Sequence, residues 1–298
     1  MAQTRVAVVG SANMDLVAMA PALPRTGETM LGTDFVMVPG GKGANQAIAA
    51  ARAGASCTFL GAIGSDSFGV TLKARIGAAG VDTGHLRVVY GTSGVALVMV
   101  NAEGENAILV TPGANGALTS LTEEELNTVR AADVLVAQLE IPVETVTEAA
   151  VVARAAGTRV VLNAAPARPL PDELLAAVDV LVVNEGEAHA LTGRGREAPQ
   201  ALLELTPRAV LTLGAEGVWY GDRDGTAVQV PPVKVETVDS TAAGDAFTAA
   251  LAVGWGEGRD LVDAVRWAAA AGAACARRLG ASVALPYRAE IDELYASA

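Results

Sequence analysis

The chain has 298 residues, of which 51% are hydrophobic and 18% are charged. A chain this long and this apolar can bury a substantial core, so intrinsic disorder is excluded. Lys and Arg together number 21 against 33 Asp and Glu, and the formal net charge of −12 argues against binding nucleic acid through a basic surface.

Membrane insertion and disulfide bonding are both disfavoured by the sequence. The apolar runs at 6–9 and 268–276 are too short to span a bilayer. Residues 1–9 lack the basic start and long apolar core of a secretion signal. With Cys57 and Cys275 as its 2 cysteines, the chain has no disulfide framework and no CxxC metal motif. We therefore expect a cytosolic protein with neither a membrane nor a nucleic-acid partner.

Apolar, strand-like segments alternate with Ala-rich helical segments along most of the chain. Helices are predicted at 142–156 and 185–192, because Gly157 and Gly193 follow them at the position that favours a helix C-cap. Continuous apolar strands separated by helices indicate a mostly parallel sheet covered on both faces, so the expected fold is a three-layer α/β/α domain. The predicted strands lie at 5–10, 133–139, 158–163, 178–184 and 208–214.

Two stretches break this alternation. Residues 94–101 and 106–111 predict a β-hairpin, and residues 16–38 lack helical periodicity. These strands are too few to fold alone, so they could form a flap over a site, although a simple extension of the sheet edge would look similar. We expect one domain over 1–298, with a small β lid built from about 12–38 and 90–112. A further hairpin is predicted within 217–230, near the edge of the main sheet.

The most informative segment is 238–251, in which a loop of small residues leads into a predicted helix. Backbone N–H groups at a helix N-terminus attract anions, helped by a partial charge of roughly +0.5. Ala242, Ala243 and Gly244 leave room there for a phosphoryl group, and Asp245 follows in the first turn. This carboxylate could simply complement the helix dipole, or it could act as a general base beside the phosphate being transferred.

Two further clusters carry polar side chains among small residues. Residues 39–47 (PGGKGANQA) offer Lys42 and Asn45 between glycines that allow close backbone approach, without the spacing of a Walker A loop. Residues 10–15 (GSANMD) place Asn13 and Asp15 just after the first strand, where α/β sheets bind ligands, and do not match GxGxxG. The glycine cluster could be an ordinary turn, but nothing structural requires a lysine between glycines.

Taken together, these clusters resemble the ribokinase-like (PfkB) carbohydrate kinase family. The motifs that carry the resemblance are GSANMD at 10–15, GGKGANQA at 40–47, QLE at 138–140, NEGE at 184–187 and DSTAAGD at 239–245. The Asn13/Asp15 pair and the segments 103–106 and 163–168 are most similar to members that phosphorylate ribose. The resemblance implies the ribokinase-like fold and ATP-dependent phosphorylation of D-ribose at the 5-hydroxyl, giving D-ribose 5-phosphate.

The resemblance also implies roles for individual residues. Asp245 matches the general base of the family, and the backbone amides of Ala242, Ala243 and Gly244 match its anion hole. The sugar would be held by Asn13, Asp15, Gly41, Lys42, Gly43, Asn45, Glu140 and Asp245. ATP would contact Asn184, Thr212, Leu213, Gly214, Ala215, Glu216, Gly217 and Gly244.

Metal ions and a second subunit are implied in the same way. Glu187 completes an NxxE pattern that the family associates with Mg²⁺ held through water, although Asn184 and Glu187 alone would indicate a helix start. Ala284 stands where the family often has Ser, so a side-chain ligand to K⁺ would be lost there. The lid strands would meet those of a second copy, giving a homodimer. The implied K⁺ ligands, mostly backbone carbonyls, are Asp239, Thr241, Cys275, Arg278, Gly280 and Ala284.

Two alternative functions stay open from the sequence. Another sugar or nucleoside kinase of the same family would share the catalytic residues, although a nucleoside base needs an aromatic surface and only 4% of the residues are aromatic. A sugar or nucleotide sensor without activity is disfavoured, because Asp245 and Gly244 are both present.

Overall fold

The computed structural model describes residues 3–194 and 198–298, and over these residues the largest unit is a nine-stranded sheet. Neighbouring strands pair in parallel except at one edge, where β11, β12 and β13 are antiparallel. This confirms the mostly parallel sheet and the predicted hairpin at its edge. From edge to edge the strands are β13 (Ala227–Val230), β12 (Val218–Asp222), β11 (Arg208–Thr212), β10 (Val180–Asn184), β9 (Arg159–Asn163), β8 (Val134–Ala137), β1 (Arg5–Val9), β4 (Ser56–Gly64) and β5 (Leu86–Val89).

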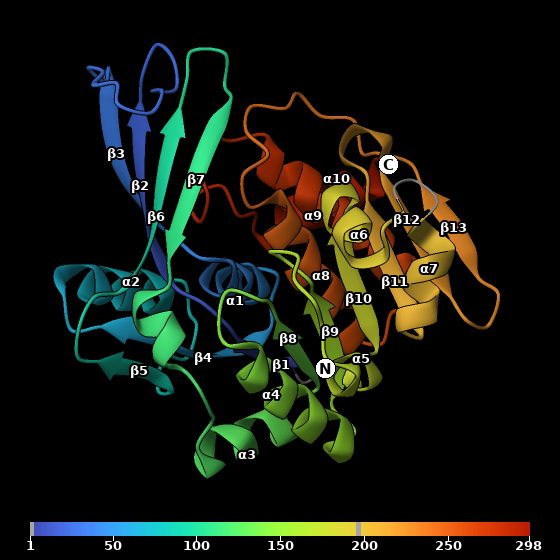
Figure 1. Cartoon of the computed structure of the whole chain (residues 1–298). Coiled ribbons are helices and arrows are strands. Elements are labelled where there is room, and N and C mark those ends of the chain that lie inside the picture. Colours follow the sequence, from blue (N-terminus) through green and yellow to red (C-terminus); the bar gives the residue numbers. More distant parts are fainter. Residues whose placement is uncertain (1–2, 195–197) are drawn as a thin grey trace.

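The two faces of this sheet are covered by different helices, so the protein has two cores. On β1, Val6 and Val8 belong to one core and Ala7 and Val9 to the other, as alternate residues of a strand should. Helices lie on both sides of the sheet in Figure 1, which is the three-layer arrangement predicted. The first core is closed by α1 (Lys42–Arg52), α2 (Ser67–Ala78), α8 (Ala243–Gly256), α9 (Leu261–Ala276) and α10 (Arg288–Ala296). The second is closed by α3 (Glu123–Ala131), α4 (Val143–Ala156), α5 (Asp172–Ala177), α6 (Glu185–Thr192) and α7 (Ala198–Leu205).

The helix ends follow the sequence signals. Helices α4 and α6 stop at Gly157 and Gly193, and both glycines are left-handed, as the C-cap interpretation requires. Across 3–194 and 198–298, none of the helices combines the length and the apolar composition needed to cross a membrane.

A second, four-stranded sheet projects away from the helical layers (Figure 1), and its residues overlap those predicted for the lid, with β3 running two residues past position 38. Its order is β3 (Asp34–Gly40), β2 (Asn13–Met19), β6 (Gly94–Val100) and β7 (Asn106–Thr111). Strands β6 and β7 form the predicted antiparallel hairpin. Asn13 pairs with both Gly40 and Gly94, so the start of β2, the end of β3 and the start of β6 meet at one point, shortly after β1 ends at Val9.

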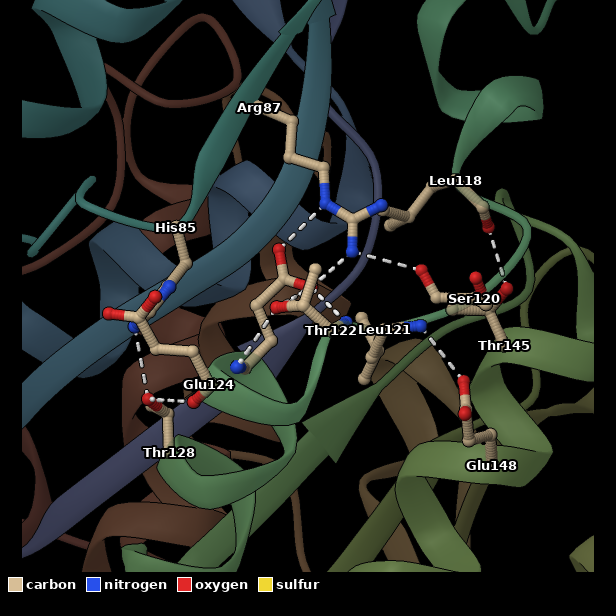
Figure 2. Close-up of polar contacts among 11 residues, drawn as sticks. His85, Arg87, Leu118, Ser120, Leu121, Thr122, Glu124, Thr128, Thr145 and Glu148 are labelled. Atoms are coloured by element: carbon tan, nitrogen blue, oxygen red, sulfur yellow. Dashed lines mark hydrogen bonds and ion pairs between the residues drawn. The ribbon is translucent and has the colours of Figure 1, made fainter.

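The connection from β7 to α3 is anchored by side chains of the main body (Figure 2). The Arg87 guanidinium on β5 donates to the Ser120 carbonyl at 3.0 Å, and the Thr145 hydroxyl on α4 donates to the Leu118 carbonyl at 2.6 Å. Between these anchors and the lid lies the short 3₁₀ helix η1 (Gly113–Ala117), which carries Asn115. The anchors therefore fix the position of Asn115, whose contacts are described below.

Candidate active site

The centre of the site is the Asp245 carboxylate in the first turn of α8, which is only 7% exposed. Its Oδ2 accepts a hydrogen bond from Asn45 Nδ2 at 3.0 Å, and its Oδ1 accepts one from Gln46 Nε2 at 2.9 Å. Burial raises the pKa of Asp245, while the nearby Lys42 ammonium and the two amide donors oppose that rise. A carboxylate whose pKa is raised by burial, and whose ionised form still receives hydrogen bonds, suits a general base.

The loop before α8 adopts the geometry of an anion site. Ala242 is left-handed, with φ of 62°, and the helix begins without a side-chain cap. The amide of Ala243 donates to the Ser240 carbonyl at 3.1 Å, so it already has an acceptor within the protein in this conformation. Within the described residues, no acceptor satisfies the amides of Ala242 and Gly244, which remain available to an anion.

Glu140 organises the predicted sugar-binding residues. Its Oε2 accepts hydrogen bonds from the Ser11 hydroxyl at 2.5 Å, the Lys42 backbone amide at 3.0 Å and Asn13 Nδ2 at 3.4 Å. Asn115 Nδ2 in turn donates to Asn13 Oδ1 at 2.7 Å, which orients the Asn13 amide so that its NH₂ group faces Glu140. Four segments that are far apart in sequence thus meet as one polar cluster at the base of the lid.

Asp15 lies beside this cluster on β2. Burial, together with the negative charges of Glu140 and Asp245, raises its pKa to about 7. A carboxylate on the lid strand therefore changes charge near neutral pH, at the position predicted to bind sugar.

The Lys42 ammonium joins these groups electrostatically. Burial opposes its charge, but the surrounding carboxylates outweigh burial and raise the pKa of the lysine. These carboxylates are, in order of effect, Asp245, Glu140, Glu187 and Asp15. The lysine therefore stays charged, close to the Asp245 carboxylate.

Glycines at the start of α1 are required by close backbone packing. Gly41 has φ of +91°, and a Cβ there would lie 2.6 Å from the Asn13 amide nitrogen. A Cβ on Gly43 would lie 2.5 Å from the Ser11 amide nitrogen. The glycine motif brings α1 against the end of β1, and this contact places Lys42 and Asn45 in the site.

A groove of about 920 Å³ opens on the other side of the α8 N-terminus, between the β10–β12 loops and α9. Its wall includes Gly244 and Ala243, so it reaches the anion site. Leu213 was predicted to contact ATP but does not belong to this wall, because its side chain packs against the core under α3–α7. Glu216 lies in the same turn and is also outside the wall. The predicted ATP contacts that line the groove are Asn184, Thr212, Gly214, Ala215, Gly217 and Gly244.

Asn184 and Glu187 form a reciprocal cap at the start of α6. The Asn184 amide donates to Glu187 Oε2, and the Glu187 amide donates to Asn184 Oδ1, both at 2.8 Å. Burial raises the pKa of Glu187, and Lys42 opposes the rise. The helix-start interpretation is therefore confirmed, and the same carboxylate also faces the charged centre of the site.

The sequence profile of the pfkB family of carbohydrate kinases matches residues 3–288. The chain belongs to the PfkB family.

Individual PfkB relatives cover the chain almost completely. A ribokinase of Bacillus subtilis is 39% identical over 290 residues, which make up 97% of this chain and 98% of that protein. A ribokinase of Haemophilus influenzae is 37% identical over 296 residues, or 96% of each chain. The solved structure of Arabidopsis thaliana ribokinase complexed with ribose and ATP has a TM-score of 0.92 and 32% identity, covering 99% of each chain. The ribokinase-like fold is thereby confirmed.

Four of the six residues implied for K⁺ are linked to one another in this PfkB protein, namely Asp239, Thr241, Cys275 and Gly280. Asp239 Oδ1 accepts from the amide and the hydroxyl of Thr241, at 2.9 and 2.7 Å, and Asp239 Oδ2 accepts from the Gly280 amide at 2.9 Å. The Cys275 thiol contacts the Thr241 carbonyl at 3.6 Å, and Arg278 pairs with Glu290. These bonds tie the loop before α8 to the segment after α9.

Sequence reasoning missed several side chains that hold the site together. Gln46 contacts the base directly, and Asn115 and Ser11 hold Asn13 and Glu140. Gln46 adjoins Asn45 in the glycine motif, so its place in the motif was a signal that could have been used. Asn115 had no such signal, because it lies outside every motif.

Proposed function

We propose that this PfkB protein transfers the γ-phosphoryl group of ATP to the 5-hydroxyl of D-ribose and releases D-ribose 5-phosphate. The observation that carries this proposal is the position of Asp245. Its carboxylate contacts Asn45 of the sugar cluster, while the neighbouring residues Ala243 and Gly244 line the nucleotide groove. A base between an acceptor site and a phosphate site is what phosphoryl transfer to a hydroxyl requires.

The residues of the site divide the chemistry between them. Asp245 takes the proton of the 5-hydroxyl as this oxygen attacks the γ-phosphorus, a contribution of typically about 10²–10⁴-fold. The amides of Ala242 and Gly244 bind the oxygens on which negative charge develops. The Lys42 ammonium adds a fixed positive charge beside them, and the bond from the γ-phosphorus to the leaving oxygen of ADP breaks as the new one forms.

Selectivity for a free sugar comes from the part-buried polar cluster. Asn13, Asp15 and Glu140 present amide and carboxylate groups that a polyhydroxylated sugar can satisfy. A sugar that lacks one of the matching hydroxyls leaves a buried group unpaired, and such sites reject analogues strongly. We expect ribose to be preferred over deoxyribose, fructose and adenosine.

Mg²⁺ fits beside Glu187. This carboxylate uses Oε2 in the helix cap, and it interacts electrostatically with Lys42 and Asp245. A single carboxylate acting through water matches the way Mg²⁺ is usually held with nucleotides. When bound, the ion neutralises charge on the phosphates of ATP.

A monovalent cation fits the Asp239–Gly280 region. The Asp239 carboxylate accepts three hydrogen bonds from protein donors, so it fixes the two loops, and their backbone carbonyls would provide most of the oxygen ligands. Carbonyl ligation also tolerates Ala at position 284. Because these loops hold the Ala242 and Gly244 amides, replacing K⁺ with a large organic cation should lower turnover without abolishing it.

An assay of ATP consumption over a sugar panel tests the proposed function. Purified protein is given ATP, Mg²⁺ and K⁺ with ribose, deoxyribose, fructose or adenosine, and ³¹P NMR identifies the product. Ribose should give the highest kcat/KM and a phosphate ester at O5. A clear preference for adenosine, or phosphate on another hydroxyl, would overturn the assignment.

We further propose that the lid sheet mediates a homodimer. Leu16 pairs with Met37 and with Leu97, and Leu97 pairs with Leu109. Paired residues share one face of a sheet, so Met37, Leu97 and Leu109 lie on the face opposite Asp15, the neighbour of Leu16 on β2. Leu109 is 62% exposed and Met37 58%. A second copy of the same sheet would cover this apolar face and the open edges of β3 and β7. Light scattering should report a dimer, and Leu109→Asp should give a monomer; a monomeric wild type would refute the proposal.

A further inference from the structure

A chain of buried amide side chains leads away from the Asp245 carboxylate. Gln46 Nε2 donates to Asp245 Oδ1 at 2.9 Å and to Asn163 Oδ1 at 3.1 Å. Gln138 Nε2 donates to Gln46 Oε1 at 2.5 Å. Gln46 and Gln138 are both fully buried, with no measurable exposure, and Asn163 is 8% exposed. Polar side chains buried this deeply need a structural or functional reason.

The Asp245 carboxylate and the Asn163 amide determine which group donates and which accepts along this row of amide side chains. The Asp245 carboxylate can only accept, so Gln46 must present its NH₂ group to it. The oxygen of Gln46 then points the other way and needs a donor, which Gln138 provides. Asn163 uses its own NH₂ group on the Val182 carbonyl at 3.3 Å, which leaves its oxygen for Gln46. The protein thus holds the Gln46 side chain in one orientation, from both ends.

The two oxygens of the base have different partners as a result. Oδ1 is bound by Gln46, whose side chain is fully buried. Oδ2 is bound by Asn45, one of the residues predicted to hold the sugar. The oxygen of the Asn45 amide is buried without a partner among the described residues, so this side chain has unmet hydrogen bonding that a sugar hydroxyl could satisfy.

We propose that Gln46, supported by Gln138 and Asn163, is a positioning residue that holds Oδ1 of the base and reserves Oδ2 for the hydroxyl of the acceptor sugar. This inference rests on the proposed function, because it assigns Asp245 the role of base. Gln46 itself touches neither sugar nor ATP. It keeps the carboxylate plane aimed at the site, and Asn45 shares Oδ2 until a sugar arrives.

Gln46 also affects the charge of the base. A donor on Oδ1 favours the ionised carboxylate, so it counteracts the burial that raises the pKa of Asp245. Other elements act on the same carboxylate: Lys42 on α1 favours its charge, whereas Glu140, Asp15 and Glu187 disfavour it. The Cys275 thiol on α9 is neutral, with a pKa raised to about 12. Loss of the Gln46 donor should therefore move the acid limb of the kcat profile to higher pH.

The decisive variant is Gln46→Leu, which keeps the size and removes the donor. We expect kcat to fall by about tenfold to a hundredfold, the cost of a misaimed catalytic group. The KM for ribose should stay within about threefold of wild type, because Gln46 does not bind the sugar. Gln200→Leu, at an exposed position on α7, is the matched control and should change neither constant. An unchanged kcat and pH profile in Gln46→Leu, or a raised KM with normal kcat, would overturn the proposal.

Gln138→Leu provides a second test that leaves Asp245, Gln46 and Asn45 themselves unchanged. It removes the donor that orients Gln46, so kcat should fall by about twofold to tenfold with the same upward shift of the acid limb. If Gln46→Leu does not fold, this variant decides, and a wild-type profile would refute the inference.

A readout without turnover separates this inference from the proposed function. The carboxyl ¹³C signal of Asp245, assigned through Asp245→Asn, is titrated in wild type and in Gln46→Leu. A higher pKa in the variant supports the positioning role even if no sugar in the panel is phosphorylated. An identical titration removes the role even if ribose turnover is confirmed.

Discussion

On the sugar side of the site, Glu140, Asn13 and Asn115 already hydrogen-bond one another in sheltered positions. The nucleotide groove, in contrast, is walled largely by glycine, alanine and other small residues, with Lys234 as a cationic side chain in its wall and the unengaged amide of Gly244 at its end. On the proposed function, the sugar side selects through side chains that must be matched, and the nucleotide side binds mainly through backbone amides, shape and this one cation. Asp245 lies between the sugar side and the nucleotide side of the site.

The largest expected effect comes from removing the base at this junction. Asp245→Asn keeps the size and can still accept from Gln46, but it cannot take a proton, so kcat should fall by about 10²–10⁴-fold. Ribose and ATP should still bind, as measured by calorimetry, because their other contacts are intact. Turnover within about tenfold of wild type would mean that the two sides of the site do not meet at Asp245.

Two glycine substitutions should show that the sugar side is tightly packed and that the nucleotide side is open. A methyl group on Gly43 would lie 2.5 Å from the Ser11 amide nitrogen and 2.7 Å from the Gly10 carbonyl carbon, so Gly43→Ala should lower the free energy of unfolding by about 1–3 kcal/mol. A methyl group on Gly244 meets nothing within 4 Å. Gly244→Ala should change the free energy of unfolding by less than about 0.5 kcal/mol.

The assay for this pair is chemical denaturation followed by kinetics. Because its methyl group enters the space meant for phosphate, Gly244→Ala should raise the KM for ATP while leaving stability intact. If both variants were equally stable, or if Gly244→Ala were the less stable one, the contrast between a packed sugar side and an open nucleotide side would be wrong.

The fold was predictable because its strands are continuous apolar runs. Val6–Val9 can be buried on both faces only in a sheet covered on both sides, and the helix stops at Gly157 and Gly193 follow from the left-handed caps that glycine favours. Pattern and local backbone preference were sufficient at this level. The lid strands were predicted from a different signal: residues 94–101 and 106–111 form a hairpin pattern, and residues 16–38 lack helical periodicity.

The site was predictable only as far as its motifs reach. Asp245 and Lys42 stand in recognisable segments, but the partner of Asn13 is Asn115, 102 residues away, and the partner of Asp245 is Gln46, 199 residues away. Such contacts depend on how the chain packs, which single-segment patterns do not contain. The engagement of the Ala243 amide by Ser240 depends on the left-handed turn at Ala242, a conformation that an alanine sequence does not suggest.

Asn115→Ala tests whether the sugar side depends on this long-range contact. Without Asn115 Nδ2, Asn13 Oδ1 loses its partner and the amide can turn away from Glu140. A buried group left without its partner costs about 1–3 kcal/mol, so the KM for ribose should rise by about fivefold to a hundredfold. The KM for ATP should not change, and a rise in both constants would show that the two sides are coupled through η1.

The smallest effect is the dependence of sugar capture on pH near neutrality. The Asp15 carboxyl, with its pKa raised to about 7 by burial and by Glu140 and Asp245, is neutral below that pH and charged above it. Only the charged form can accept from sugar hydroxyls with both oxygens, so kcat/KM for ribose should fall towards acid, by about tenfold between pH 7 and pH 6 at most. Asp15→Asn cannot titrate and should show a lower, flat kcat/KM across this range. An acid limb near pH 7 that persists in Asp15→Asn would assign the titration to another group, such as Asp245, and would move the pH sensitivity from the sugar side to the junction.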